Sequence, residues 1–193
     1  MDGIGSAPGA AVLITGTVGA GKTTVAQMVG DLLSDAGAPN AVIDLDWLRR
    51  SWPSPAGDRF NNELELRNLR PVARNYLDAG ARRLVLAGVV ETRAGRDRYQ
   101  DALGVPLSVC RLRVDLAVVR ARLGRRHQGE DAALGWHLDR SGELEAILQG
   151  AGVEDVVVDA TSGSILEDAS AGSIRGIAAA VIEAVGWNVQ SHG

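Results

Sequence analysis

The sequence is poor in cysteine and aromatic residues, and it has no long hydrophobic run. Its 193 residues include one cysteine, Cys110, which excludes an internal disulfide framework and favours a reducing compartment. No apolar stretch approaches the roughly 20 residues that a membrane-spanning helix needs. Residues 1–9 lack the basic start and the long apolar stretch of a signal peptide. We therefore expect a soluble, cytoplasmic protein without a membrane partner.

Positive charge is also in short supply. The 24 acidic residues exceed the 20 basic ones, and a net charge of −4 argues against general binding to nucleic acid. Hydrophobic residues make up 46% of the chain and charged residues 23%, which is typical of a globular protein. The length suits one domain over residues 1–193, with loose ends at 1–9 and 187–193. The sequence indicates no oligomeric state.

Short apolar runs alternate with helical patterns along the chain. The runs predict five strands, at residues 11–15, 41–45, 84–90, 109–114 and 156–159. Apolar spacing predicts helices between and after them, at residues 23–36, 69–77, 116–123, 132–148 and 174–185. Pro71 predicts that the second helix starts or kinks near Leu69, and Ser141-Gly142 suggests a break in the fourth. This alternation predicts an α/β three-layer sandwich, with a five-stranded, mostly parallel sheet and helices on both faces.

Residues 16–23, G-T-V-G-A-G-K-T, match the phosphate-loop pattern G-x-x-x-x-G-K-[ST] without a gap. In such a loop the glycines let backbone N–H groups surround phosphate oxygens, and the helix that follows adds positive charge. Lys22 would reach the β- and γ-phosphates, and the Thr23 hydroxyl would bind Mg²⁺. The predicted nucleotide-binding residues are Gly16, Thr17, Val18, Gly19, Ala20, Gly21, Lys22, Thr23 and Thr24.

Lys22 is the single lysine among the 20 basic residues. A genomic bias toward arginine codons explains the shortage but not the position of the one lysine. A compact, flexible ammonium cannot be replaced by a planar guanidinium in a tight loop. The lone lysine therefore argues against the alternative that this segment is a glycine-rich turn without a ligand.

Two carboxylates, Asp44 and Asp46, follow the second predicted strand. Residues two apart point the same way at a strand end, toward the sheet edge where ligands bind. One carboxylate could orient the waters of a metal ion, and the other could accept a proton from an attacking hydroxyl. The alternative is that both only cap the next helix.

The segment D-L-D-W-L-R at residues 44–49 resembles the D-G-D-N-hydrophobic-R stretch of adenylylsulfate kinases. Residues 87–98 likewise resemble their third strand and its arginine-rich turn. Over roughly residues 11–159 the chain thus resembles the small P-loop metabolite kinases, which include adenylylsulfate, shikimate and gluconate kinases and chloramphenicol phosphotransferase. The resemblance implies ATP and Mg²⁺ as cofactors. It makes Asp46 the candidate base, Asp44 its partner near Mg²⁺, and Asp46, Trp47, Arg49 and Arg93 the substrate contacts.

The sequence departs from this family at two places. The third strand ends in Ala87-Gly88 without the usual Walker B acid, and Glu91 comes only later. The lysine-bearing substrate segment of adenylylsulfate kinases is missing, because Lys22 is the only lysine, so we expect a different acceptor. The lysine of the GTPase signature N-K-x-D is missing for the same reason, which favours ATP as the nucleotide.

Arginines cluster after the fourth strand, in a segment that the resemblance makes a lid at about residues 120–135. Lid arginines close over the γ-phosphate and exclude water. Arg122 and Arg126 share one helical face and are the predicted catalytic arginines. The alternatives are a solvated helix face and a nucleic-acid contact, which the acidic net charge disfavours.

Aromatic side chains flank the segment after Asp46. Trp47, Trp52 and Phe60 form either an apolar wall for a substrate or part of the core. Tyr76 and Trp136 are expected to be packing residues.

The sequence as a whole predicts an ATP- and Mg²⁺-dependent kinase that phosphorylates an alcohol group of a small molecule. An antibiotic-modifying phosphotransferase is a variant of this prediction. Two alternatives stay open: a nucleotide-binding regulatory ATPase without a metabolite acceptor, and a nucleoside or nucleotide kinase.

Overall fold

Five parallel strands form the centre of the protein, in the order β2-β3-β1-β4-β5. The computed structural model describes residues 9–126, 131–161 and 171–187, apart from the side chains of 126, 131–133 and 171–173. The strands are β1 (Ala10–Thr15), β2 (Asn40–Asp44), β3 (Arg83–Ala87), β4 (Leu107–Arg113) and β5 (Val156–Asp159). The helices are α1 (Lys22–Asp35), α2 (Leu45–Leu48), α3 (Asn62–Asp78), α4 (Arg93–Leu103), α5 (Leu116–Arg126), α6 (Asp131–Ala151) and α7 (Ala171–Ala184).

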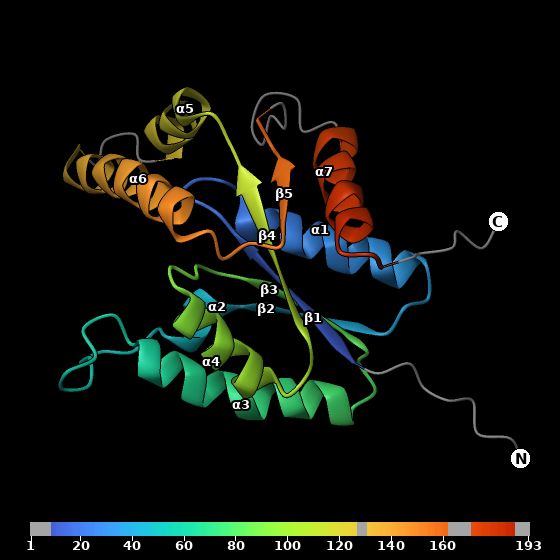
Figure 1. The fold of residues 1–193 in the computed structure, drawn as a ribbon. Coiled ribbons are helices and arrows are strands. Elements are labelled where there is room, and N and C mark those ends of the chain that lie inside the picture. The colour runs from blue at the N-terminus through green and yellow to red at the C-terminus, as the bar shows by residue number, and fades with distance from the viewer. Residues whose placement is uncertain (1–8, 127–130, 162–170, 188–193) are drawn as a thin grey trace, which may run out of the picture.

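Helices cover both faces of this sheet (Figure 1). Helices α1 and α7 pack on one face, and α3 and α4 pack on the other. Every pair of neighbouring strands is parallel. The predicted α/β three-layer sandwich is therefore confirmed.

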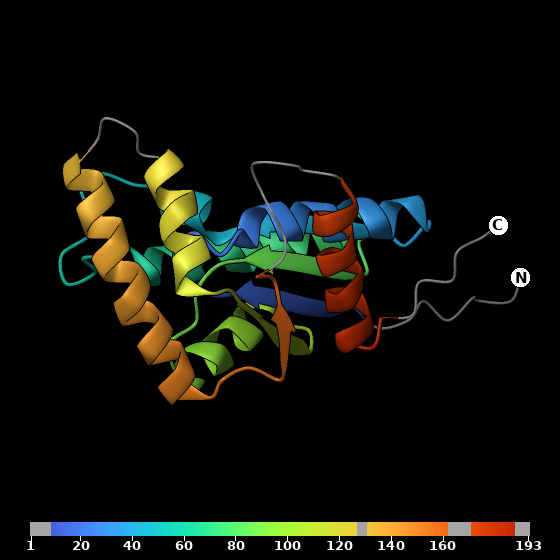
Figure 2. The same cartoon turned by 90° about the horizontal axis from the view of Figure 1, so that it is seen from above.

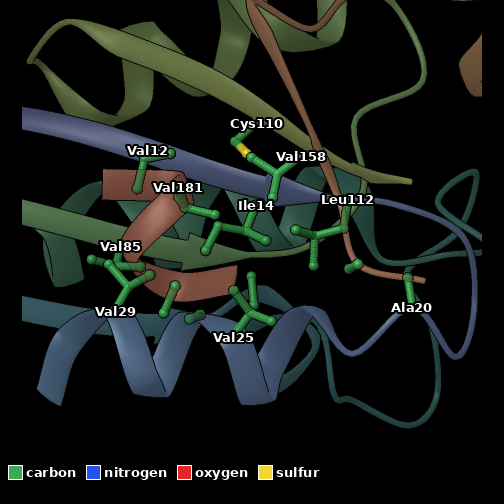
Figure 3. Close-up of a cluster of buried hydrophobic side chains, with 14 of the residues drawn as sticks. Val12, Ile14, Ala20, Val25, Val29, Val85, Cys110, Leu112, Val158 and Val181 are labelled. Carbon is green, nitrogen blue, oxygen red and sulfur yellow. The ribbon is translucent and has the colours of Figure 1, made fainter. Parts of the chain in front are cut away.

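The central strand β1 is buried on both faces. Its side chains alternate between two hydrophobic clusters, because successive residues of a strand point to opposite sides. Val12 and Ile14 pack with residues of α1 and α7, as Figure 3 shows, while Leu13 joins the cluster under α3 and α4. This burial explains why residues 11–15 read as an unbroken apolar run.

Helices α5 and α6 pack on each other and project from the carboxyl end of the sheet (Figure 2). Arg111 of β4 anchors α6, because its buried guanidinium lies 2.6 Å from Glu145 of α6 and 3.3 Å from Glu154. Residues 49–61 project from the same end of the molecule (Figures 1 and 2). The α5–α6 pair and residues 49–61 therefore both extend beyond the carboxyl edge of the sheet.

The predicted start of the second helix near Leu69 is wrong, since α3 begins at Asn62 and continues through Pro71, while a kink there stays a prediction. Asp58 caps the earlier start, as its carboxylate accepts hydrogen bonds from the backbone of residues 62–64 at 2.6–3.2 Å. Pro71 lies on the exposed side of α3, where the carbonyl that loses its partner can reach water, while Leu69 and Ala73 are buried.

The suggested break at Ser141-Gly142 is also wrong. Helix α6 is continuous, and the Ser141 hydroxyl donates to the carbonyl of Leu138 within it. Leu144 and Leu148 on the same helix are buried and hold it in place.

Three expectations about aromatic residues are corrected by the structure. Trp187 is buried and stacks with the Arg83 guanidinium at 5.4 Å, so this residue is anchored rather than loose. Of the predicted loose ends 1–9 and 187–193, residues 1–8 and 188–193 lie outside the described residues. Tyr76 and Trp136 are exposed rather than packed.

None of the described helices is long and apolar enough to cross a membrane.

Close packing of α1 on β2 yields a first testable prediction. A Cβ added to Gly30 would lie 2.4 Å from Cγ2 of Val42, so Gly30→Ala should lower the free energy of unfolding by about 1–3 kcal/mol. Gly142 in α6 is the matched control, because a Cβ there meets no described atom within 4 Å. Gly142→Ala should raise stability by about 0.5–1 kcal/mol through helix propensity. Urea unfolding measures both, and equal effects of the two substitutions would contradict the packing account.

Candidate nucleotide and acceptor site

The loop between β1 and α1 has the backbone that a phosphate cradle needs. Gly19 and Gly21 adopt positive φ angles of 81° and 90°, which residues with side chains rarely adopt. Helix α1 begins directly after Gly21, without a side-chain cap. Its first N–H groups and its dipole are therefore available to an anion.

Packing fixes the loop from two sides. Ala20 is buried and Val18 packs against the core. The buried Thr17 hydroxyl donates to the carbonyl of Ser141 in α6 at 2.6 Å. A Cβ on Gly19 would meet Val119 and Leu123 of α5 at 3.3 Å. The predicted loop, from Gly16 through Thr24, thus lies directly against α5 and α6.

Lys22 folds back across the loop. Its Nζ donates to the carbonyls of Gly16 and Thr17 at 3.1 and 3.0 Å. Burial lowers the pKa of the ammonium to about 8, against the opposing pull of the negative Asp46 and Asp44. Its present partners are neutral carbonyls, and a phosphate oxygen would form a stronger, charge-assisted hydrogen bond.

Thr23 and Asp44 meet at the carboxyl edge of the sheet. The Thr23 hydroxyl donates to Oδ2 of Asp44 at 2.8 Å, while Oδ1 of Asp44 accepts from the backbone N–H of Asp46 at 3.0 Å. Asp44 therefore caps α2, as the capping alternative predicted for it, and it also contacts the phosphate loop. Hydroxyl and carboxylate oxygens are ligands that suit Mg²⁺. Among the described residues no group of three or more His, Cys, Asp or Glu could hold a metal ion, so Mg²⁺ here would need phosphate oxygens and water as further ligands.

Asp46 is the most accessible acid beside this pair. Its side chain is 78% exposed on α2, and it lies 3.6 Å from Nε of Arg49. Arg49, a predicted substrate contact, is held within the protein. Its guanidinium pairs with the fully buried Glu65 and donates to Asn62 at 3.3 Å.

The other predicted substrate arginine also has a partner inside the chain. Arg93 begins α4 and donates to the carbonyl of Gly152 at 3.2 Å. Glu91, the acid that comes late after β3, pairs with Arg140 of α6 at 2.7 Å. The substrate role of Arg93 stays a prediction.

The absence of an acid at the end of β3 has a packing cause. A Cβ on Gly88 would lie 2.4 Å from Cδ1 of Leu45, the first residue of α2. Leu45 is fully buried. Since Leu45 fills the space, no side chain fits at Gly88 without displacing the side chain of Leu45.

The structure describes only part of the predicted lid. Arg122 is 5% exposed on α5, and its pKa is lowered by burial and by the positive charge of Arg125. Arg126 ends α5, but its side chain lies outside the described residues, as do residues 127–130. Since α5 also contacts Gly19, the segment that carries these arginines lies against the phosphate loop.

The aromatic residues after Asp46 lie on the surface. Trp47, Trp52 and Phe60 are 69%, 92% and 63% exposed, which excludes the alternative that they are core residues. The Arg50 guanidinium lies 5.1 Å from the ring centre of Trp47. Arg59 lies similarly, 5.5 Å from Phe60. Such cation–π pairs contribute about 0.5–1 kcal/mol at exposed sites and leave the rings of Trp47 and Phe60 accessible.

Sequence reasoning missed the residues at the start of α3 and within it that hold the end of α2. Asn68 donates to the carbonyl of Leu48 at 2.7 Å, and Asn61 donates to the carbonyl of Arg49 at 2.7 Å. Glu65 lies between the two asparagines in the sequence, and Asn61 directly precedes α3. Their spacing of four and three residues was visible, but a polar helical stripe normally faces water.

These features together define a P-loop nucleotide-binding protein. A glycine-rich loop lies between a buried strand and a helix, its lysine and threonine are in place, and an acid from the neighbouring part of the sheet contacts the threonine. The comparison with known proteins agrees. The model of the adenylylsulphate kinase family matches residues 8–125, more than half of the chain, and the protein therefore belongs to this family.

Two curated relatives align with shorter stretches. The probable adenylyl-sulfate kinase of Aeropyrum pernix is 42% identical over 65 residues, which is 34% of each chain. The bifunctional enzyme CysN/CysC of Rhodopirellula baltica is 34% identical over 116 residues, which is 54% of this chain and 18% of the relative. The matches thus span about a third or less of the length of these relatives.

Solved structures show the same fold at low sequence identity. The Deinococcus radiodurans tunicamycin resistance protein has a TM-score of 0.59 at 19% identity, with 94% of this chain and 98% of that chain covered. The Acinetobacter baumannii shikimate kinase also has a TM-score of 0.59, at 18% identity, with 93% of each chain covered. These likenesses support the three-layer P-loop kinase fold.

The two contacts of Asp44 can be separated by substitution. Asn is as good an N-cap as Asp, so Asp44→Asn should leave the free energy of unfolding nearly unchanged, whereas Asp44→Ala should lower it by about 0.5–2 kcal/mol. Both substitutions remove the carboxylate charge beside Thr23 and should weaken Mg·ATP binding alike. Urea unfolding and calorimetric titration measure the two effects. Full Mg·ATP affinity in Asp44→Asn would show that Asp44 acts only as a cap.

Proposed function

We propose that the protein is a kinase that transfers the γ-phosphoryl group of ATP, with Mg²⁺, to an alcohol group of a small molecule. The observation that carries this proposal is the exposed carboxylate of Asp46, placed beside Lys22 and the Thr23–Asp44 pair. A protein that only binds nucleotide needs no accessible acid at that point. Family membership supports the same reaction class.

In the proposed reaction the hydroxyl oxygen of the acceptor bonds to the γ-phosphorus, and Asp46 accepts the proton of that hydroxyl. The bond between that phosphorus and the β,γ-bridging oxygen breaks, and ADP leaves. Lys22 and the loop N–H groups stabilise charge on the phosphates. Thr23 and Asp44 would hold Mg²⁺, which would supply positive charge near the phosphates. Arg122 and Arg126 are the proposed lid arginines.

The acceptor would lie against the exposed aromatic residues after Asp46. Trp47, Trp52 and Phe60 can cover a ring or an aliphatic body. The relatives named above are adenylyl-sulfate and shikimate kinases and a tunicamycin resistance protein. Since Lys22 is the only lysine, we propose an acceptor other than adenylylsulfate, whether a metabolite, a nucleoside or an antibiotic. We further propose a cytoplasmic location, in keeping with the single buried cysteine.

A regulatory ATPase is the second candidate. The observation that favours it is the packing of Leu45 into the space at Gly88, which leaves the end of β3 without an acid. Such a protein would bind ATP and hydrolyse it slowly, without any acceptor.

ADP release from Mg·ATP tests the proposal. We expect pooled hydroxyl metabolites, nucleosides or antibiotics to stimulate release by the wild type. Asp46→Asn should lower the stimulated rate by about 100-fold or more while ATP binding persists, because the variant cannot take the proton. Lys22→Ala should lose ATP binding.

Near wild-type stimulation in Asp46→Asn would refute the assignment of the base. ATP binding that needs Lys22, with no stimulation by any pool, would favour the regulatory ATPase.

A further inference from the structure

The acid-bearing helix α2 is too short to hold itself in place. It has four residues, Leu45–Leu48, and isolated helices of that length are unstable in water. Its first residue, Leu45, is buried, but Asp46 and Trp47 face solvent. The orientation of Asp46 must therefore be set by contacts that reach α2 from other elements.

Those contacts come from α3 and from Asn61, the residue that precedes it. Asn68 and Asn61 bind the carbonyls of Leu48 and Arg49, which are free because α2 ends there. Between these asparagines, Glu65 pairs with the guanidinium of Arg49. Arg49 lies one helical turn after Asp46, with Nε 3.6 Å from the Asp46 carboxylate.

Glu65 is itself fixed by a second helix. The hydroxyl of the buried Tyr99, on α4, donates to Oε1 of Glu65. Burial raises the pKa of the Glu65 carboxyl, and the hydrogen bonds from Tyr99 and Arg49 oppose that change. Burial also raises the pKa of Tyr99, which keeps its hydroxyl protonated as a donor. The chain Tyr99–Glu65–Arg49–Asp46 thus leads from a buried tyrosine to the exposed acid.

A purely structural role would need no such arrangement. A charge with no exposed surface costs free energy, and packed apolar residues would join α3 to α4 as well. Arg49 also contacts both acids. Its Nη2 pairs with Glu65, and its Nε lies 3.6 Å from Asp46, whose side chain stays 78% exposed.

We propose that Glu65 and Tyr99 are positioning residues, which hold Arg49 so that Asp46 keeps its orientation beside the phosphate loop. This inference rests on the proposed function, because it gives Asp46 the role of the base. Neither Glu65 nor Tyr99 touches the reacting atoms in this account.

The test compares Glu65→Gln with a matched control on the same two helices. Glu63 of α3 pairs with Arg98 of α4 at 2.5 Å on the surface, away from Arg49. Glu63→Gln removes an equal charge and an α3–α4 ion pair without touching the network. Tyr99→Phe is a milder variant that keeps the buried ring. If Glu65→Gln does not fold, the same measurements on Tyr99→Phe test the proposal.

The first measurement is amide hydrogen exchange of the peptide that covers residues 45–51, and it needs no acceptor. We expect Glu65→Gln and Tyr99→Phe to speed exchange in this peptide, and Glu63→Gln to leave it at the wild-type rate. Equal exchange in Glu65→Gln and Glu63→Gln would overturn the proposal.

The second measurement is acceptor-stimulated ADP release. Glu65→Gln should lower kcat by about tenfold while the KM for ATP stays the same, because a displaced base slows only the transfer step. The double variant Arg49→Met/Glu65→Gln should be no slower than Arg49→Met alone, since Glu65 acts through Arg49. The proposal would be overturned if the losses of kcat in the two single variants multiplied in the double variant, or if Glu65→Gln kept the wild-type kcat.

The two proposals fail in different ways. Wild-type protein that no pool stimulates refutes the proposed function, and a fully active Asp46→Asn refutes the base, whatever Glu65→Gln does. An inactive Asp46→Asn beside a fully active Glu65→Gln leaves the proposed function standing and removes only the positioning role.

Discussion

The hydrogen bond from Thr23 to Asp44 joins the two halves of the candidate site. Thr23 lies in the first turn of α1, at the end of the phosphate loop. Asp44 ends β2, which is two strands away from β1 in the sheet. Parallel register makes this possible: Asp44 lies beside Ala87, and Ala87 lies beside Ile14 near the end of β1. All parallel strands end at one edge, so the loop and the acids meet there. Asp46, Lys22 and the aromatic residues after α2 take their places relative to this bond.

Contacts from neighbouring elements fix the groups around that bond. Leu45 fills the space beside Gly88 and so keeps a side chain from the end of β3. Thr17 reaches Ser141, which couples the phosphate loop to α6. Arg49 binds Glu65 of α3. The site thus depends on two further helices, α3 and α6, which contribute none of the proposed reacting groups.

The sequence was sufficient for the fold and for the phosphate loop. Apolar runs that are buried on both faces identify parallel strands, and the pattern that ends in Lys22 and Thr23 identifies the loop, because both signals are local. The start of α3 was missed, since the Asp58 cap lies four residues before Asn62 and Pro71 suggested an interruption. The Glu65–Arg49 pair was missed for a different reason. It joins residues whose contact depends on how α3 lies against α2, which no periodicity reveals.

The fate of the γ-phosphoryl group tests the central claim most directly. Wild-type protein would be incubated with Mg·ATP labelled at that group, together with the stimulating pool, and the products would be separated. The account predicts that the label appears in an organic phosphate ester in proportion to the ADP formed. Label found only in inorganic phosphate, at a rate that no pool alters, would contradict the account and mark the protein as an ATPase.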